Sequence, residues 1–174
     1  PDRSHPGPPP ILGGIQGEEV HYAAPDGTRL LGWWFEAEAP ADGPPPPAVL
    51  FFHGNAGHLG DRAFQAQGML REGVSLFLAA YRGYGGSEGR PSPAGHLEDA
   101  EGALDALLDR VEGPEKVVIH GRSLGGAVAA GLARKRPQVA GLVLESTFTD
   151  LPAMARAAYP FLPGPLLGRL SGLH

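Results

Sequence analysis

Four short runs of continuously apolar residues constrain the fold more than any other feature of the chain. They read AVLFFH, VSLFLAAY, KVVIH and GLVLES, and the expected strands end at residues 53, 81, 120 and 145. Runs without apolar–polar alternation are typical of strands covered on both faces, as in a parallel sheet. Helix-like segments lie between them. The sequence therefore predicts an α/β fold, with a mostly parallel twisted sheet and helices on both faces.

Local signals refine this prediction. Ser92 followed by Pro93 is typical of a helix start, and a stripe of apolar residues continues from there to residue 111. Ahead of the parallel strands, EEVHYAA and RLLGWWFEA predict an antiparallel hairpin with a two-residue turn at Asp26 and Gly27. Trp33 and Trp34 are expected to pack within that strand rather than to bind a ligand.

The chain divides into three expected parts. Residues 1–16 are a proline-rich lead-in, and residues 17–150 carry the predicted strands and helices of the α/β core. Residues 151–174 are apolar but interrupted by prolines, and we interpret them as the start of a cap or lid.

Composition excludes several functional classes. Apolar residues make up 42% and charged residues 19% of the chain, as in a globular domain, and the net charge of −5 argues against a nucleic-acid partner. The absence of cysteine excludes disulfides and thiolate metal sites, and no motif calls for a metal or an organic cofactor. Because the first residue is Pro1, a cytoplasmic location and an exported or membrane-anchored one, with the anchor removed before Pro1, both remain open.

The stretch GRSLGG, residues 121–126, is the strongest candidate for chemistry. It follows a predicted strand and precedes a predicted helix, with Ser123 between Gly121 and Gly125. A sharp strand-to-helix turn lifts a serine hydroxyl clear of the backbone but forces strained backbone angles at the serine, and glycines two residues away on either side avoid a clash. The Leu124 amide then lies at a helix N-terminus, where it could stabilise an oxyanion. The competing interpretation is a glycine-rich turn with an incidental serine.

The stretch HGNAG, residues 53–57, follows the first parallel strand. A loop at this place can supply the second backbone donor of an oxyanion hole. Asn55 is the expected donor, and Ala56 is the alternative. His53 is expected to brace the loop rather than to act as the catalytic base.

Four motifs occur in order: FFHGNAG, YRGYGGSEG, HGRSLGGAVA and LVLESTF. In sequence and spacing they resemble the α/β-hydrolase superfamily, and most closely the Bem46-like serine hydrolases, over residues 18–150. The resemblance implies that Ser123 is the nucleophile and that Asn55 and Leu124 form the oxyanion hole. One departure is Ala80, where such proteins often have aspartate.

The rest of a catalytic triad is hard to find in the chain. Acid and histidine follow the serine in this fold, which leaves Glu145 or Asp150 with the terminal His174. The resemblance instead places the acid and the histidine after two further strands, which implies that residues 17–150 are the nucleophile half of a hydrolase core whose C-terminal strands are missing from this chain. A terminal residue is usually frayed, so we expect the acid and base to come from a missing C-terminal segment or from a second chain.

Two functions therefore compete. The favoured one is a serine hydrolase that cleaves a small acyl ester or thioester through an acyl-enzyme. The alternative is a non-catalytic binding module that keeps the same fold.

Overall fold

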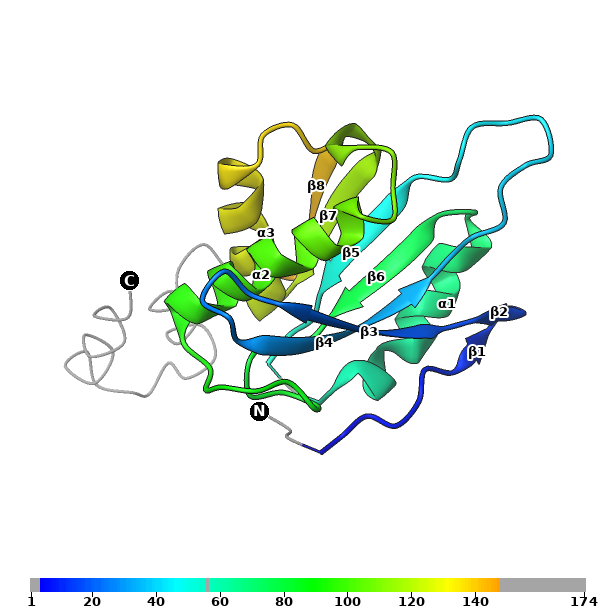
Figure 1. The fold of residues 1–174 in the computed structure, drawn as a ribbon. Coiled ribbons are helices and arrows are strands. Elements are labelled where there is room, and N and C mark those ends of the chain that lie inside the picture. The colour runs from blue at the N-terminus through cyan, green and yellow to red at the C-terminus, as the bar shows by residue number, and fades with distance from the viewer. Residues whose placement is uncertain (1–3, 56, 148–174) are drawn as a thin grey trace.

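A six-stranded sheet forms the centre of the described part of the chain, residues 4–55 and 57–147 of a computed structural model (Figure 1). Its order is β3-β4-β6-β5-β7-β8. The strands are β3 (Glu18–Ala23), β4 (Arg29–Phe35), β5 (Ala48–Phe52), β6 (Ser75–Ala79), β7 (Val117–Arg122) and β8 (Gly141–Glu145).

The parallel block of this sheet is built from the four apolar runs. β5 pairs in parallel with both β6 and β7, and β7 pairs in parallel with β8. β3 and β4 are antiparallel to each other, and β4 is antiparallel to β6. The predicted α/β class and the predicted neighbourhood of these four strands are confirmed.

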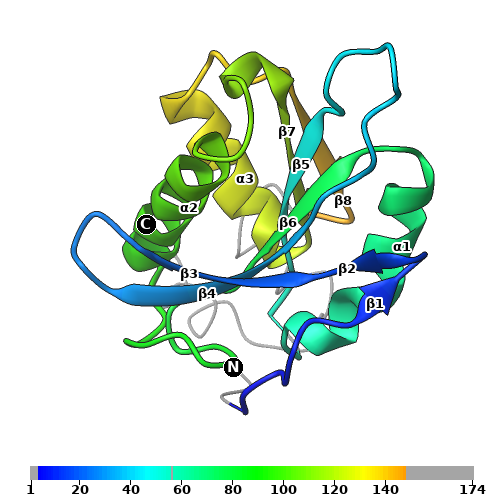
Figure 2. The ribbon, with the colours of Figure 1, turned by 45° about the vertical axis from the view of Figure 1, so that its right-hand side comes forward.

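Helices cover both faces of the sheet (Figure 2). α2 (Pro93–Leu108) and α3 (Leu124–Lys135) pack on one face, where they share a core with Trp34, Leu50 and Phe77. α1 (Ala63–Arg71), which follows the short helix η1 (Leu59–Arg62), lies on the other face. A second short helix, η2 (Pro114–Lys116), leads into β7. The two tryptophans are buried on opposite faces, because neighbouring strand residues point to opposite sides.

The start of α2 follows its sequence signal. The Ser92 Oγ accepts a hydrogen bond of 3.0 Å from the Gly95 N–H, and Pro93 occupies the first turn. The cap satisfies one of the free N–H groups at the helix start. The predicted apolar stripe is confirmed in part. Three of its members are fully buried, namely Ala100, Leu104 and Leu107, and three are partly buried, namely Leu97, Leu108 and Val111.

Two features near the N-terminus differ from the prediction. A small antiparallel hairpin, β1 (Ile11–Leu12) and β2 (Ile15–Gln16), lies within the proline-rich lead-in. The two-residue turn between β3 and β4 is wrong in length, since residues 24–28 join the strands. The Gly27 N–H donates to Ala24 O, and Gly27 has a φ of 84°, which glycine adopts without strain.

The expected cap, residues 151–174, lies outside the described residues. Within residues 4–55 and 57–147, the longest apolar helices are too short to cross a bilayer.

Candidate active site

Ser123 occupies the sharp turn between the end of β7 and the start of α3. Its backbone angles are φ 55° and ψ −117°, a combination that is strained for a residue with a side chain. Ser123 is partly exposed at the carboxyl edge of the parallel strands. The strained backbone that the sequence predicts at this serine is therefore present.

The two flanking glycines are required by close packing. A Cβ atom on Gly125 would lie 2.0 Å from the carbonyl oxygen of Phe52, at the end of β5. A Cβ atom on Gly121 would lie 2.2 Å from the carbonyl oxygen of Gly125. Neither position accepts a side chain without a backbone shift, so the turn depends on both glycines.

The end of β8 holds the strained turn in place. The Ser123 N–H donates to Glu145 O at 2.9 Å, and the Thr147 hydroxyl donates to Ser123 O at 2.9 Å. The Gly126 N–H also donates to Ser123 O, at 3.0 Å. Sequence reasoning missed Thr147, because the contact joins positions 24 residues apart and no local pattern marks it.

The loop after β5 lies directly against the serine. A Cβ atom on Gly54 would be 3.3 Å from Ser123 Cβ and 3.8 Å from its Oγ. Asn55 follows Gly54, and Leu124 is the first residue of α3, where the N–H has no partner within the helix. The structure thus brings together the three residues that the sequence singled out, Ser123, Asn55 and Leu124. The alternative donor, Ala56, lies outside the described residues.

His53 is buried inside this loop, with 1% of its surface exposed. Its Nδ1 lies 2.6 Å from Gly54 O, and since a carbonyl oxygen can only accept, Nδ1 carries the proton. Burial lowers the pKa of His53 to about 4. Burial and the lowered pKa make this imidazole a poor base for Ser123, and its bond to Gly54 O supports a bracing role.

Two tyrosine hydroxyls hold the same loop from the segment after β6. The Tyr81 hydroxyl donates to His53 O at 2.9 Å, and the Tyr84 hydroxyl donates to the Asn55 Oδ1 at 2.6 Å. Both tyrosines are buried, with at most 1% of their surface exposed. Sequence reasoning did not find these contacts, which join residues 28 and 29 positions apart.

The candidate triad acid Glu145 is engaged elsewhere. Its carboxylate lies 3.2 Å from His120 Nε2 and 3.3 Å from Arg122 Nε, both on β7. The other two formal triad members, Asp150 and His174, lie outside the described residues. Among the residues that are described, no group of three carboxylate or imidazole side chains could hold a metal ion.

Three consecutive large apolar side chains are exposed on the edge strand β8. Leu142, Val143 and Leu144 have 40%, 45% and 47% of their surfaces exposed. In the described part of the chain, β8 pairs only with β7. This edge is therefore open next to the strained serine turn.

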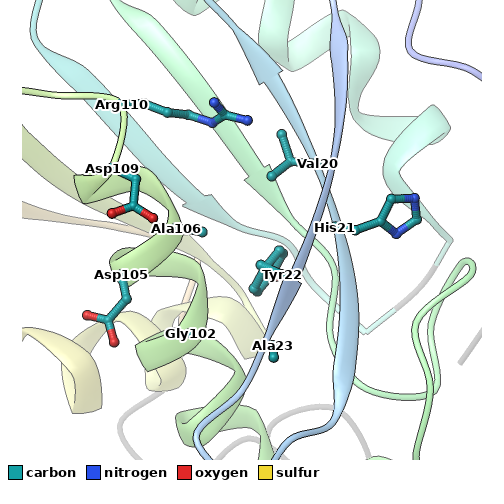
Figure 3. A pocket seen from close by; sticks show the side chains of 9 residues that line it. All are labelled: Val20, His21, Tyr22, Ala23, Gly102, Asp105, Ala106, Asp109 and Arg110. Atoms are coloured by element: carbon teal, nitrogen blue, oxygen red, sulfur yellow. The ribbon is translucent and has the colours of Figure 1, made fainter.

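A separate pocket of about 410 Å³ lies between β3 and α2 (Figure 3). Arg110 reaches from just beyond α2 towards β3, where its guanidinium lies 2.7 Å from the Glu18 carboxylate. None of the lining residues belongs to 53–57 or 121–126, so the pocket is not part of this site.

Comparison with known proteins agrees with this geometry. A family model described as serine aminopeptidase, S33, matches residues 43–171. The α/β hydrolase domain-containing protein WAV2 of Arabidopsis thaliana is 40% identical over 148 residues, which is 83% of this chain and 47% of WAV2. Protein bem46 of Schizosaccharomyces pombe is 38% identical over 118 residues, which is 66% of this chain and 40% of bem46. The chain spans about half the length of these curated relatives.

Two solved structures share the fold. An α/β hydrolase from Vibrio vulnificus superposes with a TM-score of 0.76 at 25% identity, covering 91% of this chain and 55% of that one. The Pyrococcus furiosus esterase Pf2001 superposes with a TM-score of 0.68 at 22% identity, covering 95% of this chain and 68% of that one. Because the family model spans most of the sequence and solved α/β hydrolases share its architecture, the chain belongs to the serine aminopeptidase S33 family of α/β hydrolases.

Proposed function

We propose that the protein is a serine hydrolase that cleaves an ester or thioester through an acyl-enzyme, with Ser123 as the nucleophile. The observation that carries the proposal is the strained backbone of Ser123, held against the Gly54–Asn55 loop. Proteins keep such strain mainly at functional sites, because the surrounding structure must offset its cost.

The proposed reaction has two halves. In the first, Ser123 Oγ attacks the carbonyl carbon of the substrate while a base accepts the hydroxyl proton. The oxyanion that forms accepts hydrogen bonds from the N–H groups of Asn55 and Leu124. The alcohol or thiol leaves with a proton, and the acyl group remains on Oγ. In the second half, water attacks the ester by the same route and releases the acid and the free serine.

We propose that the acid and the base come from outside the described residues. His53 is buried and committed to its own loop, and the Glu145 carboxylate contacts His120 and Arg122. A further part of the full-length protein is the favoured source, since the relatives are about twice as long as this chain. The open edge at β8 offers a place where more sheet could add. A second chain is the other possible source.

Amide cleavage is a second candidate, because the matching family model is described as a serine aminopeptidase. The same nucleophile and oxyanion hole serve both reactions, and the fold alone does not decide between them. We favour esters because the only acidic residue of the described chain that follows Ser123 is not free to bind a substrate amine. Glu145, the first acidic residue after Ser123 in the sequence, already contacts two basic side chains.

The test compares full-length wild-type protein with Ser123→Ala on p-nitrophenyl esters, acyl thioesters and aminoacyl p-nitroanilides. We expect ester or thioester turnover in the wild type and a loss of at least about 10³-fold in the variant. Equal rates in both proteins would refute the nucleophile assignment. A folded wild type that is inactive on all three substrate classes would favour the non-catalytic module, and turnover of anilides alone would favour the peptidase.

A further inference from the structure

We infer that Tyr84 is a positioning residue for the oxyanion hole: its hydroxyl holds the Asn55 side chain and thereby keeps the Asn55 N–H aimed at the reacting carbonyl oxygen. The inference rests on the proposed function, because it assigns a task to a residue that does not itself touch the substrate.

The contact itself is short and well defined. The Tyr84 hydroxyl lies 2.6 Å from the Asn55 Oδ1, and it is the donor because an amide oxygen only accepts. Tyr84 is 1% exposed, whereas Asn55 is an exposed residue at the surface of the site. Burial raises the pKa of Tyr84, so the hydroxyl keeps its proton at the pH values where a serine hydrolase works. A buried group therefore anchors an exposed one.

The loop needs such an anchor because of its neighbours. Gly54 has no side chain with which to hold its position, and Gly57 has a φ of 74°, a conformation that glycine adopts freely. The Tyr81 hydroxyl holds the carbonyl of His53, one residue before Gly54. The Tyr84 hydroxyl holds the side chain of Asn55, one residue after Gly54. The two contacts thus fix both ends of the segment that lies against Ser123.

The anchor is rigid in turn. The Tyr84 N–H donates to Tyr81 O at 3.0 Å, and Tyr84 O accepts from the Ser87 N–H at 2.8 Å. Between the tyrosines, the Arg82 N–H and Nε each donate to the buried Asp99 carboxylate at 2.8 Å. This carboxylate belongs to α2, so the helix and the turn move together. Tyr84 can therefore hold Asn55 against the sheet rather than follow the motion of the loop.

The functional consequence concerns the transition state. The Asn55 N–H meets a full negative charge only after Ser123 has attacked, so its aim affects the rate more than substrate binding. Loss of a complete oxyanion-hole donor typically costs about 10²- to 10³-fold in kcat. A donor that is still present but loosely held should cost less. For Tyr84→Phe we expect a fall in kcat of about 5- to 50-fold, with KM within about twofold of the wild type.

The experiment uses full-length wild type, Tyr84→Phe, Asn55→Ala and the double variant, with steady-state kinetics on the best ester substrate. Asn55→Ala keeps the backbone N–H but removes the atom that Tyr84 holds, so it should lower kcat by a similar factor. If both single variants act by breaking the same contact, the one between Tyr84 and Asn55, the kcat of the double variant should be no lower than that of the slower single variant. Tyr22→Phe is the matched control. It removes a hydroxyl that donates to Ala80 O at 3.2 Å and not to a residue of the loop, and it should leave kcat unchanged.

Each outcome decides the inference. A kcat equal to wild type in Tyr84→Phe, a rise in KM at constant kcat, or fully additive losses in the double variant would overturn it. If Tyr84→Phe does not fold, Asn55→Ala carries the same test from the exposed side of the contact. The proposed function is judged separately by Ser123→Ala. Turnover that depends on Ser123 but not on Tyr84 overturns only this inference, and turnover that does not depend on Ser123 overturns both.

Discussion

Replacing Ser123 by glycine should make the protein more stable than replacing it by alanine. Both variants remove the hydroxyl, but only alanine keeps a Cβ atom at φ 55° and ψ −117°. A residue in such a region costs about 1–3 kcal/mol. Glycine relieves this strain but loses about 0.5–1 kcal/mol through the greater freedom of the unfolded chain. The expected net gain in the free energy of unfolding is about 0.5–2 kcal/mol in favour of Ser123→Gly.

Urea unfolding of the full-length variants measures this difference, provided that the slopes of the transitions agree. Ala127→Gly is the control, because Ala127 is an exposed residue within α3 and glycine there should cost about 1 kcal/mol. If Ser123→Gly is less stable than Ser123→Ala by a similar amount, position 123 behaves as an ordinary position inside a helix, where no left-handed strain is relieved. The strain argument for a nucleophile turn would then be refuted.

Three further predictions concern the packing around the turn and its buried histidines. Gly125→Ala should destabilise the fold by more than about 3 kcal/mol, because its methyl group would lie 2.0 Å from a β5 carbonyl oxygen. A lower thermal unfolding midpoint would show this loss. Thr147→Val should lower stability by about 1 kcal/mol and also lower kcat, since it removes a hydroxyl donor to Ser123 O while keeping the side-chain shape. The third prediction concerns pH. Burial lowers the pKa of His53 and of His96 to about 4, so between about pH 6.5 and pH 4 the unfolded chain binds more protons than the folded one. Urea unfolding of the full-length protein should therefore show the free energy of unfolding falling by a few kcal/mol from about pH 6.5 to about pH 4.

Each of these predictions has a control and a contrary outcome. Gly68→Ala within α1, where an added Cβ atom meets open space, should be neutral or stabilising, and equal effects at Gly68 and Gly125 would contradict the packing argument. Unchanged kcat in Thr147→Val would show that the turn does not need the hydroxyl. His96→Phe should flatten the loss of stability between pH 6.5 and pH 4, and an unchanged pH profile would show that His96 titrates normally in the folded state.

The sequence could predict the features that are set by neighbouring residues. Continuous apolar runs gave the parallel strands, because a strand covered on both faces needs no polar side. The Ser92 cap and the glycines beside Ser123 act within a few residues, so their consequences can be worked out without the fold. The expected strain at Ser123 belongs to this group.

The features that sequence reasoning missed depend on contacts between distant segments. The bond from Tyr84 to Asn55 and the one from Thr147 to Ser123 join different loops, and only the sheet order brings these loops together. The turn at Asp26 and Gly27 was predicted too short, because the pairing of β3 with β4 sets how many residues the connection must contain. Short two-residue strands such as β1 leave almost no periodic signal in a proline-rich stretch.

The most direct test of the central claim is covalent labelling of the full-length protein with a fluorophosphonate, followed by peptide mass spectrometry. The account predicts one phosphonyl group on Ser123 of the native protein, and none on heat-unfolded protein or on Ser123→Ala. Labelling requires both an activated hydroxyl and donors for the developing negative charge, so it examines the nucleophile and the oxyanion hole together. A native wild-type protein that takes up no label, or that is labelled on another serine such as Ser146, would contradict the account.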